Sequence, residues 1–119
     1  MGSSNFTQLI VWQKAHQVRL AVFDVTERPP LSRMFLLMDQ MQSAALSVPG
    51  NIAEGFGRRH PKDKARFYAF AKGSADELTD YLILCRDKGY WKDNEKIQSK
   101  LEEVCRMLTR LIDLTLGAS

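Results

Sequence analysis

The sequence predicts an all-α protein, namely an antiparallel up-down four-helix bundle with a kink in its second helix. Apolar residues recur three and four positions apart along four long segments, and no segment shows the apolar-polar alternation of a half-buried strand. Proline or glycine separates the segments, and long amphipathic helices joined by short connections favour antiparallel neighbours. The 119 residues are about the length of one domain, which we expect to span residues 5–116.

The first helix is expected over residues 7–27. The Pro29-Pro30 pair follows it, and because proline lacks a backbone N–H and its ring obstructs the preceding turn, the helix ends there. Apolar side chains cover more than one stripe of this helix, which predicts contacts with two different neighbours. The short ends of the chain, residues 1–4 and 117–119, have the composition of frayed termini, and we assign them no function.

The second helix is expected to begin at Ser32, a good N-cap residue, and to continue to Phe56, with Gly55 and Gly57 ending it. Pro49 interrupts its interior. A proline ring clashes with the carbonyl group four residues earlier, and one intrahelical hydrogen bond is lost. A kink is therefore predicted at this point.

The residues after this proline are explained by backbone geometry. Asn51 and Glu54 have the spacing of a capping box, so the helix is expected to restart after the kink with Asn51 as its cap. The nearby glycines follow a helix instead of a strand, and the GxxxxGK[ST] pattern of a phosphate-binding loop is missing. We therefore expect no chemistry from this stretch itself.

The third helix is expected from Pro61, a favoured first helical residue, to a stop at Gly89. The fourth is expected to begin near Asp93 or Asn94, and its apolar residues form a heptad-like seam. This seam consists of Ile97, Leu101, Val104, Leu108, Leu111 and Thr115.

Gly73 is an unusual residue for the interior of the third helix, where glycine costs about 1 kcal/mol relative to alanine. With Ala69 and Ala75 it forms a small-residue face, and the Ala44-Ala45 pair of the second helix is expected opposite this face. A close helix crossing at Gly73 is therefore predicted, with a surface position that tolerates glycine as the alternative.

The residue types that carry catalysis or bind metals lack partners in this sequence. His16 and His60 are far apart and are expected at the surface. No glutamate has a histidine three residues later, so we assign no catalytic residue, metal site or cofactor. Cys85 and Cys105 lie in apolar helical stretches and are expected to be buried free thiols. Glu77 lies near the apolar seam of the third helix and is expected to need an arginine or a helix-end donor as partner.

Positive charge is concentrated in one part of the chain. The whole sequence has a net charge of +3, and residues 47–72 contain six lysines and arginines against two acidic residues. Five of the basic residues surround the expected start of the third helix, and these are Arg58, Arg59, Lys62, Lys64 and Arg66. Cations at a helix start oppose the helix dipole. Two interpretations stay open, a solvated loop and a site that binds nucleic-acid phosphates.

The run SVPGNIAEGFGR, residues 47–58, resembles the S-[IV]-P-x-N-I-A-E-G signature of the 23S rRNA intervening sequence proteins, also called the four helix bundle protein family. The flanks agree: FTQLIVWQKAHQV resembles the family's opening, FLLMDQMQSAALSVPGNIAEG its centre, and RFYAFAKGSADELTDYLILCRDKGY its third helix. The matching motif positions are Ser47, Pro49, Asn51, Ile52, Ala53, Glu54, Gly55, Gly73, Ser74, Glu77 and Leu78.

The resemblance implies an antiparallel four-helix bundle that assembles into a ring-like homopentamer and has no known enzymatic activity. It also implies a relation in fold to the accessory protein of diversity-generating retroelements, which binds nucleic acid together with a reverse transcriptase. The chain departs from the family at Gln42 and Ser43, where the family often has an arginine. Glu54 or Glu77 is therefore expected to lack that arginine as a partner.

Two functional hypotheses follow. The first is a non-enzymatic oligomeric scaffold that binds RNA or DNA, with the basic side chains of residues 58–66 contacting phosphates and a closed ring adding avidity. The alternative is an adaptor ring that recruits a partner protein without touching nucleic acid. No secretory segment or apolar run of about 18 residues occurs, so a cytoplasmic protein without membrane contact is expected.

Overall fold

The computed structural model describes residues 5–117 of the chain. These residues form four α-helices and two short 3-10 helices, and no strand occurs among them. The α-helices are α1 (Ile10–Thr26), α2 (Phe35–Gly57), α3 (Pro61–Lys88) and α4 (Glu95–Thr115), and the 3-10 helices are Phe6–Gln8 and Leu31–Arg33. The predicted all-α, four-helix architecture is confirmed. Of the chain ends set aside above, residues 1–4 and 118–119 lie outside the described residues.

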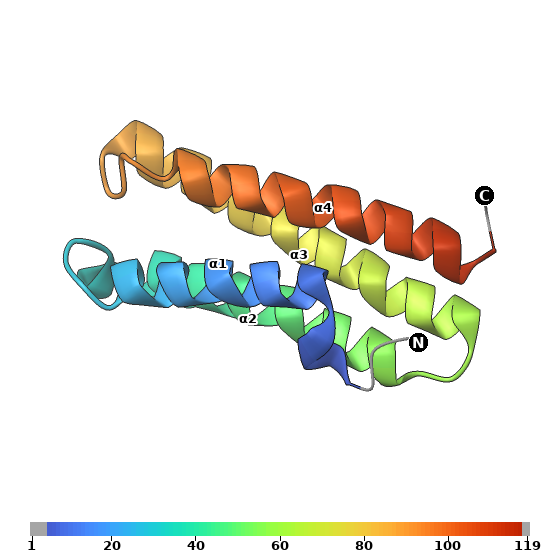
Figure 1. Ribbon diagram of the computed structural model, residues 1–119. Coiled ribbons are helices and arrows are strands. Elements are labelled where there is room, and N and C mark those ends of the chain that lie inside the picture. Colours follow the sequence, from blue (N-terminus) through green and yellow to red (C-terminus); the bar gives the residue numbers. More distant parts are fainter. Residues whose placement is uncertain (1–4, 118–119) are drawn as a thin grey trace.

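The helices lie side by side along one long axis, and the molecule measures 44 × 22 × 22 Å. Figure 1 shows the chain turning back at alternate ends of the bundle, so that consecutive helices run in opposite directions. α2 contacts both α1 and α3, and α4 closes the bundle by contacting α3 and α1. The turn from α2 to α3 therefore lies at one end, and the other two connections lie at the opposite end (Figure 1).

Each helix buries one apolar stripe, as the spacing of its apolar residues predicts. The large core side chains are Val18 and Val22 of α1, Met41, Val48 and Ile52 of α2, Leu78 and Leu82 of α3, and Leu101, Val104 and Leu108 of α4. α1 contacts α2 and α4, which confirms the prediction of two neighbours. Its apolar residues are not all buried, however, because Ile10 and Leu20 are 55% and 56% exposed.

Two helix starts differ from the predictions. The first helix begins at Ile10 instead of residue 7, because Phe6–Gln8 forms a separate 3-10 turn. Ser32 is not the N-cap of α2, since it lies within the turn Leu31–Arg33 and Met34 precedes the helix. Leu31 is fully buried. Because burial of its side chain in the core stabilises the turn Leu31–Arg33, the chain forms this turn first and α2 begins after it.

α2 is a single helix that continues through Pro49. The predicted restart at Asn51 is wrong, because Asn51 lies inside the helix and its Nδ2 donates to the Ser47 carbonyl oxygen at 2.8 Å. Gly55 does not end the helix either, which continues to Gly57. Burial of Pro49 and its neighbours in the core offsets the lost hydrogen bond. The kink stays a prediction.

α2 and α3 are in close contact at Gly55, whereas Gly73 is not in close contact with another helix. A Cβ atom at Gly73 would meet no atom within 4 Å, so the predicted close crossing there is wrong and Gly73 is an exposed position. A Cβ atom at Gly55 would lie 2.7 Å from Cε1 and 2.9 Å from Cδ1 of Tyr68, and 3.2 Å from the Lys64 carbonyl oxygen. Only glycine fits at Gly55 without a shift of its neighbours.

The end of α3 matches its prediction. Gly89 follows the helix in the left-handed conformation with a φ of 78°, which glycine adopts without strain. The N–H groups of Tyr90 and Trp91 donate to the Cys85 carbonyl oxygen at 2.8 and 3.1 Å. The Gly89 N–H is directed at the same carbonyl group, so the N–H groups that follow the helix converge on its last turn.

Asn94 joins this connection to the core. Its side chain is fully buried, its Nδ2 donates to the Leu82 carbonyl oxygen at 2.7 Å, and its Oδ1 accepts from Gln98 Nε2 at 2.7 Å. Asn94 precedes α4, yet its side chain does not cap that helix. It links α3 to the first turn of α4 instead.

Candidate nucleic-acid interface

The five basic residues predicted as a site lie where α2 turns into α3. Arg58 follows the last residue of α2, and its N–H donates to the Gly55 carbonyl oxygen at 3.2 Å. Residues 58–60 form the whole connection, and Pro61 begins α3. Because the turn is short, side chains from the end of α2 and the first turns of α3 come close to one another.

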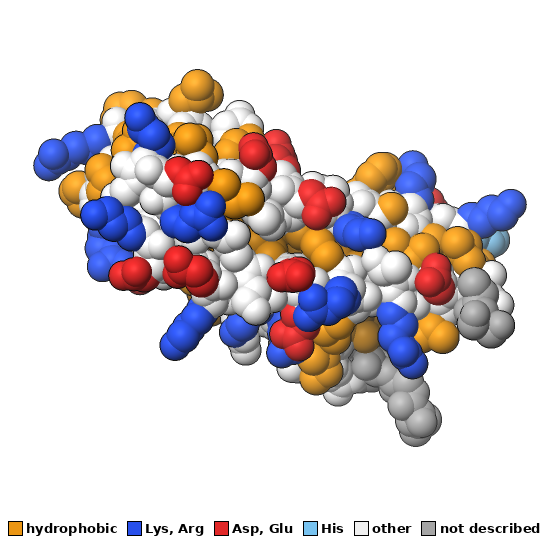
Figure 2. All heavy atoms as spheres, turned by 90° about the horizontal axis from the view of Figure 1, so that it is seen from above, with side chains coloured by type: hydrophobic (Ala, Val, Ile, Leu, Met, Phe, Trp, Pro, Cys, Tyr) orange, Lys and Arg blue, Asp and Glu red, His pale blue; other side chains and the backbone are white. Residues whose placement is uncertain are grey.

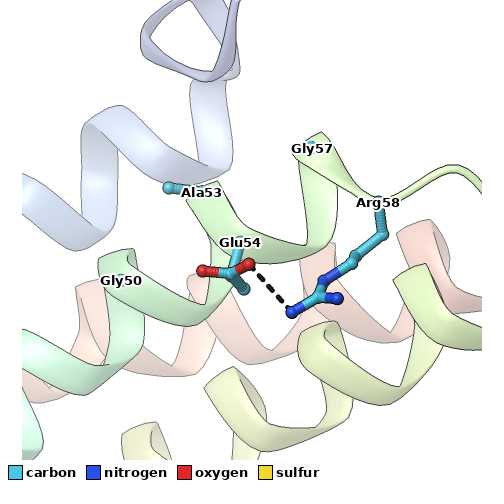
Figure 3. Close-up of a pocket in the computed structure, with 5 residues that line it drawn as sticks. All are labelled: Gly50, Ala53, Glu54, Gly57 and Arg58. Atoms are coloured by element: carbon cyan, nitrogen blue, oxygen red, sulfur yellow. Dashed lines mark ion pairs between the residues drawn. The ribbon is translucent and has the colours of Figure 1, made fainter.

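Arg58 is held by neighbours within the chain. Its Nη2 lies 3.0 Å from Glu54 Oε2 and its Nη1 lies 3.6 Å from Asp63 Oδ2. Figure 3 shows the Glu54–Arg58 ion pair along the surface of α2. The guanidinium carbon is 4.5 Å from the centre of the Phe67 ring, and the buried Nε has no hydrogen-bond partner among the described residues.

Arg66 also has partners within the chain. Its Nη2 donates to Asp63 Oδ1 at 2.6 Å, and this hydrogen bond holds the pKa of Asp63 below its usual value. Its guanidinium carbon lies 5.0 Å from the Phe67 ring centre and 5.7 Å from that of Phe70. Arg66 is exposed, so it keeps some of its surface toward solvent. The aromatic rings here stack on arginines of the same chain.

Lys64 has a structural role that the sequence did not predict. Its Nζ donates to the carbonyl oxygens of Phe56 at 2.6 Å and Gly55 at 3.3 Å. These carbonyl groups belong to the last turn of α2, where the helix dipole favours a cation. Lys64 therefore opposes the dipole at the start of α3 but stabilises the end of α2.

Replacing Lys64 with methionine is expected to lower the free energy of unfolding by about 1–2 kcal/mol, because hydrogen bonds from a charged donor are lost at a half-buried site. Lys62 is the matched control. It is exposed, so Lys62→Met is expected to change stability by less than about 0.5 kcal/mol. Urea unfolding followed by circular dichroism measures both. Equal effects of the two substitutions would contradict the capping role.

Arg59 and Lys62 differ from the other three basic residues. Both are exposed, and neither forms a hydrogen bond or ion pair with any residue in the range 5–117. Lys62 lines a shallow hollow together with His60, Pro61 and Leu116, between the α2–α3 turn and the end of α4. The structure thus brings all five basic residues to one end of the bundle. Among the described residues, Arg59 and Lys62 have no hydrogen-bond or ion-pair partner there.

The motif residues form a polar link between α2 and α3. Ser74 Oγ of α3 donates to Ser47 Oγ of α2 at 2.7 Å. Asn51 Nδ2 donates to the same Ser47 Oγ at 2.9 Å and, as described above, to the Ser47 carbonyl oxygen. This link lies in the half-buried seam of the two helices, and it gives the three residues a structural role.

The acidic motif residues find partners despite the missing arginine. Glu54 pairs with Arg58, as described above. Glu77 Oε2 lies 3.1 Å from the hydroxyl of Tyr81, one turn later on α3. Gln42, which stands where the family often has an arginine, donates from Nε2 to Thr26 Oγ1 at 3.0 Å. The observed partner of Glu77 is therefore a tyrosine hydroxyl, and the predicted arginine or helix-end donor is wrong.

Neither cysteine has the environment of an activated nucleophile. Cys85 is buried, with its Sγ 3.6 Å from Met41 Sδ, which confirms its prediction. Cys105 is only half-buried, and its Sγ lies 3.6 Å from Asp76 Oδ1. Burial raises the pKa of both thiols to about 11, so both are protonated at neutral pH.

The histidines lie in different surroundings. His60 is exposed at the α2–α3 turn, as predicted. His16 is half-buried on α1, where it stacks on Trp12 at 5.0 Å between ring centres and lies 2.9 Å from Arg19 Nη2. Across residues 5–117 no group of His, Cys, Asp and Glu side chains could hold a metal ion.

Charges of both signs are interleaved on the face shown in Figure 2, which views the bundle from above and includes α4. Such a mixture produces no field of a single sign. The basic residues of the candidate interface lie at the end of the bundle that carries the α2–α3 turn. Within the described part of the chain, no helix combines the length and apolar composition needed to cross a membrane.

The described fold and the SVPGNIAEG run on α2 agree with a known family. A family model described as 23S rRNA-intervening sequence protein matches residues 7–110, which is most of the chain. A comparison with curated proteins found no match. The matched range includes α1, α2 and α3 and most of α4. The chain therefore belongs to the 23S rRNA-intervening sequence protein family.

Proposed function

We propose that this protein is a non-enzymatic, oligomeric helical-bundle scaffold that binds the phosphate groups of RNA. The observation that carries the proposal is the pair of exposed cations, Arg59 and Lys62, which have no ion-pair partner among the described residues. Exposed cations that release counterions from phosphates supply most of the affinity in binding without sequence preference.

The neighbouring basic residues have a supporting role in this proposal. Arg58 and Lys64 hold the turn in place through their contacts with α2 and α3. Arg66 adds positive charge at the rim while pairing with Asp63. A rigid turn favours binding because less conformational entropy is lost when its side chains meet the ligand.

Oligomerisation would multiply this small basic surface. The family resemblance implies five copies in a ring, and we adopt this assembly as part of the proposal. Two cations from each copy would then contact one RNA, and binding by one copy would raise the effective concentration of RNA at the next. Light scattering that gave a monomer of 13.6 kDa at micromolar concentration would contradict the assembly.

The RNA-binding proposal predicts a strong dependence on salt. Each phosphate contact lowers the logarithm of the affinity by about 0.7 per tenfold rise in salt for single strands, so two contacts per copy give a slope of about −1.4 per copy engaged. Fluorescence polarisation with a labelled single-stranded RNA at about 50 and 200 mM salt measures this slope. We expect the double substitution Arg59→Glu/Lys62→Glu to weaken binding at low salt by about tenfold or more.

The matched control is the double substitution Lys92→Glu/Lys96→Glu, which makes the same charge change at exposed positions near the opposite end of the bundle. This control is expected to retain most of the affinity, because its charges lie far from the α2–α3 turn compared with the screening length of about 10 Å. Undetectable binding at low salt, or equal losses in the two double variants, would refute the proposal.

One observation favours the adaptor alternative. Phe35 and Leu36 at the start of α2 are 70% and 78% exposed, and Leu36 borders an apolar groove that also includes Leu84 and Tyr90. An exposed apolar patch of this kind is typical of protein-interaction sites. Capture of a defined partner from nuclease-treated lysate, lost in Leu36→Glu, would favour the adaptor over the RNA scaffold.

A further inference from the structure

Phe70 is an exposed aromatic residue on α3, close to the α2–α3 turn. Its side chain is 48% exposed. Lys62, Arg66 and Phe70 recur every four residues, so they lie in one line along the surface of the helix. Phe70 comes eight residues after Lys62, which is about 12 Å along the helix axis. A flat aromatic ring therefore follows the basic residues of the candidate interface on the same face of α3.

Contacts on the side nearer the turn hold the Phe70 ring in place. Phe67 meets it in a T-shaped arrangement, with ring centres 5.6 Å apart and an angle of 86° between the ring planes. The guanidinium carbon of Arg66 lies 5.7 Å from the centre of the Phe70 ring, and Arg66 is fixed in turn by its hydrogen bond to Asp63. Both ring partners precede Phe70 on the helix, which agrees with the tilt of helical side chains toward the N-terminus.

Gly73 leaves the other side of the ring open. The side chains three and four positions after a helical residue lean back toward it, and after Phe70 these positions are Gly73 and Ser74. Ser74 is small and turned to α2, where its Oγ donates to Ser47 Oγ at 2.7 Å. A Cβ atom at Gly73 would meet no atom within 4 Å. No contact among the described residues therefore requires glycine at this position, although glycine is unfavourable inside a helix.

We propose that Phe70 is a stacking platform for one base of a single-stranded RNA, and that Gly73 keeps the open face of the ring accessible. Stacking on an aromatic side chain raises the affinity by about fivefold to 100-fold per base, and it tolerates any sequence because every base has a π face. In a duplex the bases are stacked on one another, so a single strand offers a base to the ring and a duplex does not. The inference rests on the proposed RNA binding and adds to it a preference for single strands.

The charges on both sides of the ring orient the strand. Arg59 and Lys62 lie toward the turn, and they have no ion-pair partner among the described residues. Glu77 is exposed one turn beyond Gly73 and carries the opposite charge. Phosphates are attracted by the two cations and repelled by the carboxylate. The RNA backbone is therefore expected on the side of the turn, and the stacked base on the side of Gly73.

Replacing Phe70 with leucine tests the stacking. Leucine keeps an apolar side chain but removes the flat ring, so Phe70→Leu is expected to weaken binding of a labelled single-stranded oligo(A) RNA by about fivefold to 100-fold. The salt dependence is expected to stay the same, because the phosphate contacts remain. Phe35→Leu is the matched control, since Phe35 is 70% exposed at the start of α2, near the opposite end of the bundle. Its affinity is expected to equal that of the wild type, and circular dichroism checks that both variants fold.

Inorganic polyphosphate separates stacking from phosphate binding, because it offers phosphates without bases. The wild type and Phe70→Leu are expected to bind polyphosphate equally well, and the wild type is expected to prefer oligo(A) over a duplex RNA of the same length. Equal losses of oligo(A) and polyphosphate binding in Phe70→Leu would overturn the proposal, since the ring would then act only by holding basic residues in place.

A side chain at Gly73 gives a second test. Gly73→Leu is expected to cover the open face of the Phe70 ring and to weaken oligo(A) binding by about fivefold or more, with polyphosphate binding unchanged. Gly73→Ala is the control, because a methyl group is too short to cover the ring. Salt-dependent oligo(A) binding that neither Phe70→Leu nor Gly73→Leu weakens would overturn the stacking alone. Undetectable binding of RNA and polyphosphate by the wild type would refute the proposed function together with it.

Discussion

Replacing Gly55 with alanine is expected to lower the free energy of unfolding by about 1–2 kcal/mol. Alanine is favoured over glycine in a helix by about 1 kcal/mol, but overpacking in a core costs about 1–3 kcal/mol. The added Cβ would lie 2.7 Å from the Tyr68 ring and 3.2 Å from the backbone oxygen of Lys64. Tyr68 is 3% exposed and packed on all sides, so it cannot move away at low cost.

Gly73→Ala is the control for this prediction. It makes the same chemical change inside a helix, yet the added Cβ meets no atom within 4 Å, so we expect a gain of about 0.5–1 kcal/mol. Urea unfolding at one protein concentration compares the two variants with the wild type. If both substitutions stabilised the protein, the close contact of α2 and α3 at Gly55 would be refuted.

Asn94→Ala is expected to lower the free energy of unfolding by about 2–3 kcal/mol. The substitution removes the hydrogen bond to the Leu82 carbonyl oxygen at a fully buried site, and it leaves the half-buried Gln98 side chain without its acceptor. A hydrogen bond lost inside a protein costs more than the same bond at the surface, because a polar group stays buried without a partner. A small cavity adds to this loss.

Gln98→Ala separates the two bonds of Asn94. It removes one of them at a half-buried position, so a loss of about 1 kcal/mol is expected. The urea midpoint measures both variants, and protection of the Cys85–Trp91 amides against hydrogen exchange reports the local effect. A change below about 0.5 kcal/mol in Asn94→Ala would mean that the α3–α4 connection does not depend on this side chain.

The sequence predicts the helices well but their starts less well. Gly57 and Gly89 end α2 and α3 as expected, because these signals act within one helical turn. Ser32 and Asn51 have the chemistry of caps, yet neither caps a helix in the structure. Burial of apolar neighbours on both sides outweighs a local preference worth about 1 kcal/mol.

The candidate site was predicted only in part. Its five basic residues come from adjacent positions in the chain, so their gathering at one end follows from a short turn between two long helices. The short turn does not determine which of these five residues lack a hydrogen-bond or ion-pair partner. Lys64 donates to carbonyl groups eight and nine residues away, and Arg58 contacts acidic residues on both sides of the turn.

The sequence by itself determined the number of helices, where α2 and α3 end, the apolar stripe of each helix and membership of the family. These properties depend on neighbours within one or two turns, which a pattern of residues records directly. The tertiary structure decided that Gly55 rather than Gly73 is the point of close approach, and that Arg59 and Lys62 are the basic residues without a partner. Such properties depend on the distance between helices and on the direction of each side chain, and neither quantity is fixed by local spacing.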